Sequence, residues 1–161
     1  DKMKKYHIDE LDHQIIDILI ENARTPFTDI AKKHNVSAGT IHIRVNKMLE
    51  EGIIKGATLK LDYDKLGYSF IAYVGLHLIK SSRTDFVITE LKKIPEITVA
   101  HLITGKFGVF CKVRAKSTKH AKDIIFKIDN IPDVQRTETS ISLEESINDK
   151  NRLMHSIFEG L

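Results

Sequence analysis

Apolar residues in the first third of the chain recur at the spacing of an α-helix. Within residues 8–23, four of them fall on one stripe and predict an amphipathic helix: Leu11, Ile15, Ile18 and Leu19. Asp9 precedes the stripe and, with Asp12 three residues further on, is placed to cap that helix. Residues 25–54 contain two more short helical patterns, joined by a tight turn and followed by a strand pattern. Together these elements predict a winged helix-turn-helix domain.

The residues around the two short helices carry start and stop signals. Thr25 is predicted to be the N-cap of the first helix, with Pro26 at its first position. Asn35 tolerates the left-handed conformation that ends a helix, and Ser37 is a good cap for the next one. Residues 53–61 then read as the strand of the wing.

The second of these helices has one apolar face, which is expected to pack in the core, and an opposite face that could enter a DNA groove. Its inward stripe is predicted to be Ile41, Val45, Met48 and Leu49. Ile43 lies on the opposite face, where an apolar side chain can contact a thymine methyl in a major groove. The residues predicted to face DNA are Gly39, Thr40, His42, Ile43, Arg44 and Lys47, with Lys55 in the wing. An ordinary amphipathic helix with one stray apolar residue is the other interpretation.

Charge supports DNA binding locally rather than globally. The whole chain has 25 Lys and Arg against 22 Asp and Glu, a formal net charge of +3. Residues 24–47, however, hold five Lys or Arg side chains against a single carboxylate, Asp29. Because phosphate affinity depends on clustered cations, this segment is the predicted electrostatic contact with a nucleic acid.

From residue 69 onward the pattern changes to β-type segments separated by two helices. The predicted elements are a strand at 69–79, a helix at 84–93, strands at 97–104 and 107–115, a helix at 117–128 and a strand at 134–143. Gly105 and Lys106 are predicted to form a two-residue hairpin turn. The sequences KIPEI at 93–97 and NIPDV at 130–134 form a weak repeat, each following a helix and preceding a strand. The other interpretation of the repeat is a chance similarity between two turns.

The order βαββαβ predicts a ferredoxin-like domain, and the whole chain is therefore α+β. We place the winged helix-turn-helix domain at 1–61 and a hinge at 62–68. The ferredoxin-like domain takes 69–146, and a C-terminal tail, expected to contain a short helix, takes 147–161.

Composition narrows the class of protein further. A hydrophobic content of 42% and a charged content of 29% are typical of a globular chain. No apolar run approaches the ~20 residues of a membrane span, and the N-terminus shows no signal-peptide pattern. The single cysteine, Cys111, lies in an apolar run, so we expect a buried thiol and a reducing cytoplasm. The eight histidines form no metal-ligand spacing, and no catalytic motif is present, so we expect no enzyme, metal site or cofactor.

Several short segments, in this order and spacing, resemble one family of proteins. They are residues 8–12 (IDELD), 36–41 (VSAGTI), 50–56 (EEGIIKG), 63–67 (YDKLG) and 101–105 (HLITG). Because the match extends over both domains, the chain is identified as a member of the Lrp/AsnC family, the leucine-responsive and asparagine-operon regulators also called feast/famine proteins.

The resemblance implies a transcriptional regulator without catalytic activity. In the family the second domain pairs through its sheet into dimers, dimers commonly assemble into octamers, and small molecules, usually amino acids, bind between dimers. Double-stranded DNA, further copies of the chain and an amino-acid-like effector are therefore the expected partners. By position, Ser37 joins Gly39, Thr40, His42, Ile43 and Arg44 as DNA-facing. Ala38 and Gly39 replace the Pro and Ser common in the family, so its sequence preference does not transfer.

The effector loop is where the chain departs from the family. The usual Gly-Asp-x-Asp-Tyr is here residues 105–109, GKFGV, so both carboxylates are missing and Lys106 would repel an ammonium group. We expect either a pocket with altered specificity or a protein that needs no effector. The residues assigned to this site are Gly105, Lys106, Phe107 and Gly108, with Thr137 and Thr139 on the last strand.

A second class of function stays open on the sequence alone. A stand-alone effector-binding or protein-interaction module would explain the second domain but not the basic, groove-facing helix. DNA affinity that falls steeply with salt would distinguish the regulator from that module.

Overall fold

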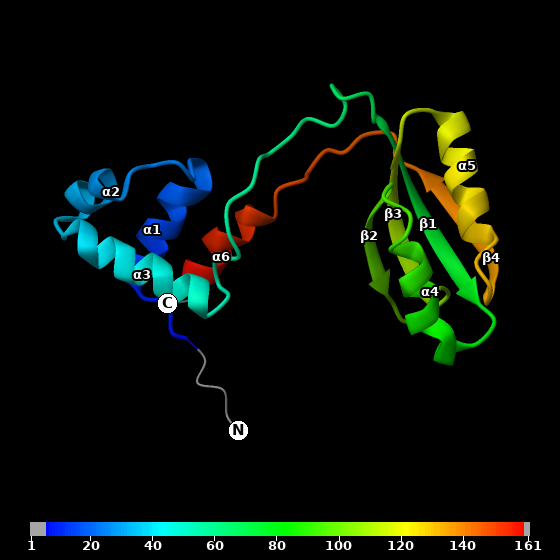
Figure 1. The fold of residues 1–161 in the computed structure, drawn as a ribbon, viewed down its shortest axis with the longest axis horizontal. Coiled ribbons are helices and arrows are strands. Elements are labelled where there is room, and N and C mark those ends of the chain that lie inside the picture. Colours follow the sequence, from blue (N-terminus) through cyan, green and yellow to red (C-terminus); the bar gives the residue numbers. More distant parts are fainter. Residues whose placement is uncertain (1–5, 160–161) are drawn as a thin grey trace. The chain divides into compact units, whose positions relative to one another are not determined.

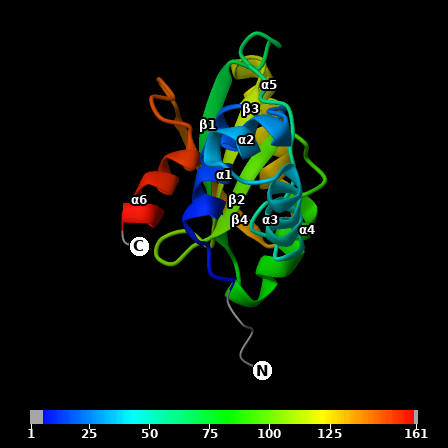
Figure 2. The ribbon, with the colours of Figure 1, turned by 90° about the vertical axis from the view of Figure 1, so that its left-hand side faces the viewer.

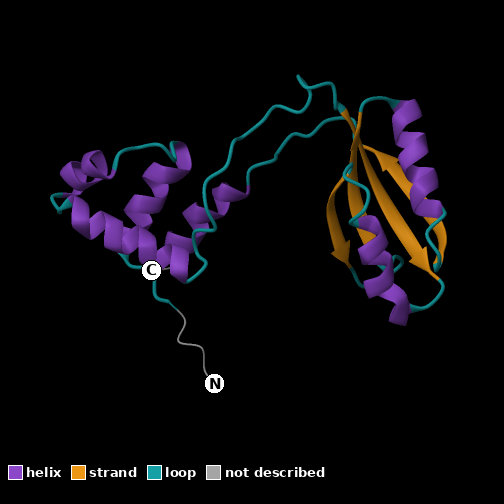
Figure 3. Ribbon diagram, in the orientation of Figure 1, coloured by secondary structure: helices purple, strands orange, loops and turns teal. Residues whose placement is uncertain are grey.

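The computed structural model describes residues 6–159; the first five and last two residues, which the predicted first domain and tail include, lie outside that range. The chain divides into two compact units. The first contains residues 1–60 together with 147–161, and the second contains residues 61–146. The first unit is helical, whereas the second combines a sheet with helices (Figures 1 and 3).

Three helices build the helix-turn-helix of the first unit: α1 (Glu10–Glu21), α2 (Phe27–His34) and α3 (Ala38–Glu50). Their apolar stripes meet in one core, whose fully buried side chains include Ile15, Ile30, Ile41 and Met48. Three members of the predicted α3 stripe are buried, but Leu49 is 42% exposed because it lies at the edge of the stripe.

The predicted caps are confirmed at two of three helix starts. The Asp9 carboxylate accepts a hydrogen bond from the Asp12 backbone N–H and completes a capping box at α1. Ser37 accepts from the backbone N–H of Thr40 at the start of α3. At α2 the prediction was one residue early, because Pro26 occupies the cap position with an extended backbone.

Asn35 ends α2 as predicted, with a left-handed φ of 54° that sets up the turn into α3. The predicted wing strand is wrong, since residues 53–61 form no strand. The backbone N–H groups of Ile53 and Ile54 instead bond the Met48 carbonyl at the end of α3. The remainder of this segment is exposed and pairs with no strand, so a ladder has nothing to form against.

The end of the chain belongs to the first unit. A 3₁₀ turn at Lys150–Arg152 leads into α6 (Leu153–Glu159), which lies beside α1 (Figure 2). Met154 packs against the helical core, and the Phe158 ring stacks on His13 with 3.4 Å between ring centroids.

The second unit has the predicted βαββαβ order. Its elements are β1 (Phe70–Leu78), a 3₁₀ turn (Ser81–Arg83), α4 (Thr84–Leu91), β2 (Ile97–Leu102), β3 (Val109–Ala115), α5 (Thr118–Asp129) and β4 (Val134–Ile141). The antiparallel sheet runs β2-β3-β1-β4, which leaves β4 at an edge as predicted. Both helices cover the same face (Figure 1) and enclose the core, which includes Val74, Leu76, Val87 and Ile124.

The opposite, open face of the sheet carries no helix of the second unit within the described residues. The hairpin between β2 and β3 also differs from the prediction. The last ladder pair is Leu102 with Val109, so residues 103–108 form a six-residue loop rather than a two-residue turn. The Ile103 N–H donates to the Gly108 carbonyl across its base, and Gly105 has a φ of 103°. The longer loop lets Phe107 turn onto β1.

Candidate DNA-binding surface and effector pocket

The outward face of α3 is the candidate DNA-binding surface. Ile43 is 68% exposed, which is unusual for a large aliphatic side chain on a short helix. Gly39, His42 and Lys47 are also exposed, and Lys55 is exposed in the segment after α3. These residues present apolar, donor and cationic groups from one edge of the domain, as a groove-reading helix requires.

Three polar residues near the start of α3 have local roles as well. Ser37 caps the helix, and its hydroxyl lies 2.9 Å from that of Thr40, which is half-buried. The ring of Phe27 in α2 meets the His42 imidazole edge-on at 4.5 Å between centroids, so His42 is held at the boundary of α2 and α3. These contacts hold the first two turns of α3.

Arg44 is the departure from the predicted set. Its guanidinium does not extend from the helix face but pairs with Asp9 and lies 3.2 Å from the Asp12 carboxylate, both at the N-terminus of α1. A residue predicted to read a base edge is therefore paired with two carboxylates of its own domain, one of them buried, and its side chain is 31% exposed. The pairing joins residues more than thirty positions apart, and no local sequence signal indicates it.

The loop of residues 103–108 closes over one end of the sheet. A Cβ added to Gly75 of β1 would lie 2.7 Å from the Phe107 ring, so only glycine leaves room for that ring. The same ring packs edge-on against His77, with 4.9 Å between centroids. Gly108 approaches Leu78 closely, with 3.1 Å from an added Cβ to that side chain. Glycines on the strand and in the loop thus allow this close packing.

Lys106 has a carboxylate partner that the sequence analysis missed. Its Nζ lies 2.8 Å from Oε1 of Glu138 on β4, and Nε2 of His77 lies 2.6 Å from Oε2 of the same group. The hydrogen bonds from Lys106 and His77 lower the pKa of Glu138 to about 2. Glu138 stands between the two predicted threonines, and its position in an alternating strand was the available signal.

A pocket of about 380 Å³ adjoins this loop. Its polar lining comes from His77, Ser81, Thr84, Lys106 and Gln135, and its apolar lining includes Leu78, Leu102, Ile103 and Phe107. The combination of the Lys106 ammonium group, hydroxyls and apolar walls suits a small ligand with both polar and apolar parts.

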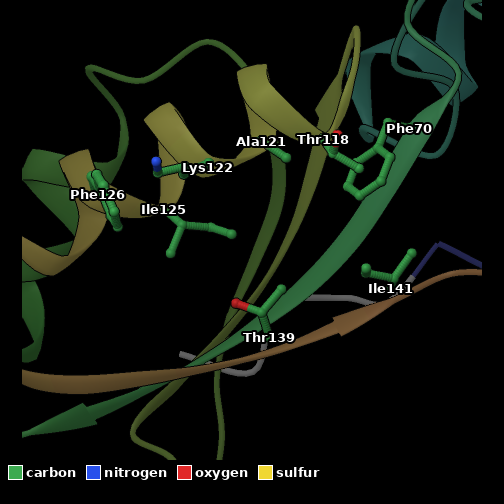
Figure 4. A pocket seen from close by; sticks show the side chains of 8 residues that line it. All are labelled: Phe70, Thr118, Ala121, Lys122, Ile125, Phe126, Thr139 and Ile141. Carbon is green, nitrogen blue, oxygen red and sulfur yellow. The ribbon is translucent and has the colours of Figure 1, made fainter.

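The two predicted threonines do not reach this pocket. Because side chains alternate along a strand, Thr137 and Thr139 lie on the face opposite to Glu138. The Thr137 hydroxyl donates to Asp129 at the end of α5, at 2.7 Å. Thr139 lines a separate, apolar pocket of about 240 Å³ between β4 and α5, with Ile125 and Ile141 (Figure 4). The structure therefore does not bring these threonines to the pocket beside the loop, and their role in effector binding stays a prediction.

Other chemistry is sparse in the part of the chain that the structure describes. Cys111 is buried, as predicted, and burial raises the pKa of its thiol to about 11, which keeps it unreactive. Across residues 6–159, no three His, Cys, Asp or Glu side chains are grouped to hold a metal ion. No helix in the same range is long and apolar enough to cross a bilayer.

A helix-turn-helix with an exposed cationic and apolar face, linked to an α+β unit with a pocket, defines a class of DNA-binding regulators that carry a ligand-binding domain. Comparison with known sequences agrees with this division. Residues 8–55 match the family model described as winged helix-turn-helix DNA-binding, and residues 71–151 match the model described as Lrp/AsnC ligand binding domain. The chain belongs to the Lrp/AsnC family of transcriptional regulators.

Relatives cover most of the chain. The regulatory protein AsnC of Haemophilus influenzae is 38% identical over 88% of this chain and 95% of its own length. The structure of E. coli AsnC superimposes with a TM-score of 0.87 at 36% identity, over 89% of this chain and 97% of the other. A feast or famine regulatory protein from M. tuberculosis, complexed with L-methionine, shares the fold with a TM-score of 0.81 at 21% identity, over 89% of this chain and 97% of its own.

Proposed function

We propose that this chain is a sequence-specific DNA-binding transcriptional regulator whose activity is modulated by an amino acid. The single observation that carries DNA binding is the outward face of α3, where Ile43 is exposed beside His42 and Lys47. A solvated helix gains nothing from an exposed isoleucine there, whereas a major groove offers thymine methyl groups.

The proposed contacts divide by type. Ser37 and Gly39 bring the N-terminus of α3 to a phosphate, and Lys47 and Lys55 add phosphate contacts. Thr40, His42 and Ile43 face the base edges. We omit Arg44 from the base-reading set because its guanidinium is paired with Asp9 and Asp12.

The effector proposal rests on Glu138. The loop lacks the family carboxylates, but Glu138 of β4 supplies one to Lys106 and His77, two residues that line the pocket. An amino acid's ammonium group would bind Glu138, and its carboxylate would bind Lys106, so the ligand would replace an existing ion pair without leaving a charge unpaired. This supports a pocket with altered specificity over an effector-independent protein.

We further propose a homo-oligomer, with pairing through the open face of the sheet. That face carries the aromatic rings of Tyr73, Phe107 and Phe110, which stack or tilt against one another at about 6.0 Å. Aromatic side chains are enriched at protein interfaces. Assembly of dimers into octamers rests on the family resemblance. We propose a cytoplasmic location for the protein. The proposed function involves no catalytic step and no cofactor.

Gel-shift titrations of the full chain against genomic fragments, between about 50 and 200 mM salt, test DNA binding. A regulator loses affinity by orders of magnitude across this range. Absence of binding at low salt would favour the stand-alone interaction module. A thermal-shift screen of the twenty amino acids tests the effector. Saturable stabilisation by one of them, lost in Glu138→Gln, is expected, and no response to any would support the effector-independent alternative.

A further inference from the structure

Asp12 is buried in a way that charged residues rarely are. It is 0% exposed and is the one charged side chain classed as buried within residues 6–159. Its carboxylate is held by three donors: the Tyr6 hydroxyl at 2.8 Å, the Arg44 guanidinium at 3.2 Å and the Asp9 backbone N–H at 3.3 Å. We call Tyr6, Asp9, Asp12 and Arg44 the Asp12 network.

The network joins α3 to the start of α1. Arg44 reaches both Asp9 and Asp12, and its planar guanidinium suits two carboxylates better than a lysine ammonium does. Burial acts to raise the pKa of Asp9, yet hydrogen bonds from Arg44 and from the Asp12 backbone hold it below its usual value. Burial and the bond to Asp12 raise the pKa of Tyr6 to about 12. These contacts thus keep the Tyr6 hydroxyl protonated, as a donor to Asp12, and the Asp9 carboxyl ionised, as a partner of Arg44.

Because Arg44 lies on α3, the network restrains the orientation of the side chains that are proposed to face DNA. Thr40 and Lys47 lie within one turn of Arg44, and Ile43 is its neighbour. Any rotation of α3 about its axis that breaks the bonds of Arg44 also moves these three side chains relative to α1. Breaking those bonds leaves a buried carboxylate uncompensated, so rotation is strongly opposed.

We infer that Arg44 is a positioning residue, which fixes the orientation of the DNA-reading face of α3 through Asp12 and Asp9 rather than by touching DNA. This inference rests on the proposed DNA binding and specifies how that surface is held. A base-reading arginine and a positioning arginine behave differently when their partners are changed, which makes the two roles separable.

The test compares Arg44→Gln, Asp12→Asn and the double variant of the full chain, for operator affinity and its dependence on salt. All are measured where circular dichroism shows native helix content. Positioning predicts about a tenfold loss in each single variant and little further loss in the double, because both break one network. It also predicts an unchanged salt slope for Arg44→Gln, whereas the control Lys47→Gln lowers that slope by about 1.

Two milder variants keep the test decisive if Arg44→Gln does not fold. Arg44→Lys retains a cation and is expected to recover part of the affinity, while Asp9→Asn removes one of the two carboxylate partners and gives an intermediate loss. A normal affinity in Asp12→Asn, or a salt slope lowered by about 1 in Arg44→Gln, would overturn the positioning role while leaving the proposed function standing. Failure of the wild-type chain to bind any DNA would overturn both.

Discussion

The two units of this protein use a cation beside a recognition site in opposite ways. In the helical unit, Arg44 lies on the reading helix but is turned inward to a buried carboxylate. In the sheet unit, Lys106 lies in the loop and pairs with Glu138, whose side chain remains 41% exposed. The first pair is positioned to fix a structure, and the second is accessible enough to exchange partners. Burial, rather than residue type, separates these roles.

The largest difference between the two pairs should appear in stability. Arg44→Ala is expected to destabilise the helical unit by about 3–5 kcal/mol, because it leaves Asp12 buried without its cation. Lys106→Ala, the matched variant in the sheet unit, should lower the free energy of unfolding by much less, since its pair is open to water. Urea unfolding followed by circular dichroism measures both. Equal losses of stability in the two variants would show that the two ion pairs do not differ in structural role.

Packing of the loop against the sheet predicts the next largest effect. Gly75→Ala places a Cβ 2.7 Å from the Phe107 ring and should cost about 1–3 kcal/mol by forcing the loop away. Gly39→Ala is the control, because its Cβ would lie 3.7 Å from the Ser37 hydroxyl oxygen, an ordinary van der Waals contact. Combining Gly75→Ala with Phe107→Ala should recover stability in thermal unfolding. No recovery would place the strain elsewhere.

An outward side chain of α3 gives a smaller effect, confined to DNA binding. Ile43→Ala is expected to weaken operator binding by about 1 kcal/mol through loss of apolar contact, without a change in stability, because Ile43 is 68% exposed. Fluorescence anisotropy with labelled operator DNA measures the loss. Undiminished affinity would show that this face does not meet bases.

The smallest expected effect is a titration shift in the sheet unit. Lys106 and His77 depress the pKa of Glu138 to about 2. The contribution of this carboxylate to folding stability is therefore fully present above its unfolded pKa of about 4.5 and is lost as the pH falls toward 2. In Lys106→Ala the carboxyl should titrate closer to its ordinary value. Carboxyl-detected NMR across pH 2–6 follows it, and an identical midpoint in both proteins would contradict the pairing.

Local patterns in the sequence were enough to predict most of the fold. The period of 3.6 residues predicts α1 to α3, and the caps at Asp9 and Ser37 mark two helix starts. The β-type segments predict all four strands and their order along the chain. These features depend on residues within a turn or a strand of each other, which is why a single sequence reveals them.

Features that depend on distant partners were missed. Arg44 meets residues 32 and 35 positions away, and Lys106 meets Glu138 across 32 positions. The wing strand failed because residues 53–61 have strand-like composition but no strand to pair with. Thr137 and Thr139 were placed by residue type alone, and the alternation of β4 turns them away from the loop.

Because α6 packs on α1, the two units are joined by two segments of the chain rather than by one. The chain leaves the helical unit near residue 60 and re-enters it near residue 147, so two covalent crossings connect the units. Phe158 and Met154 form the anchor of the second crossing. A protease cut near Gly56 would therefore leave the two halves attached until α6 itself detaches.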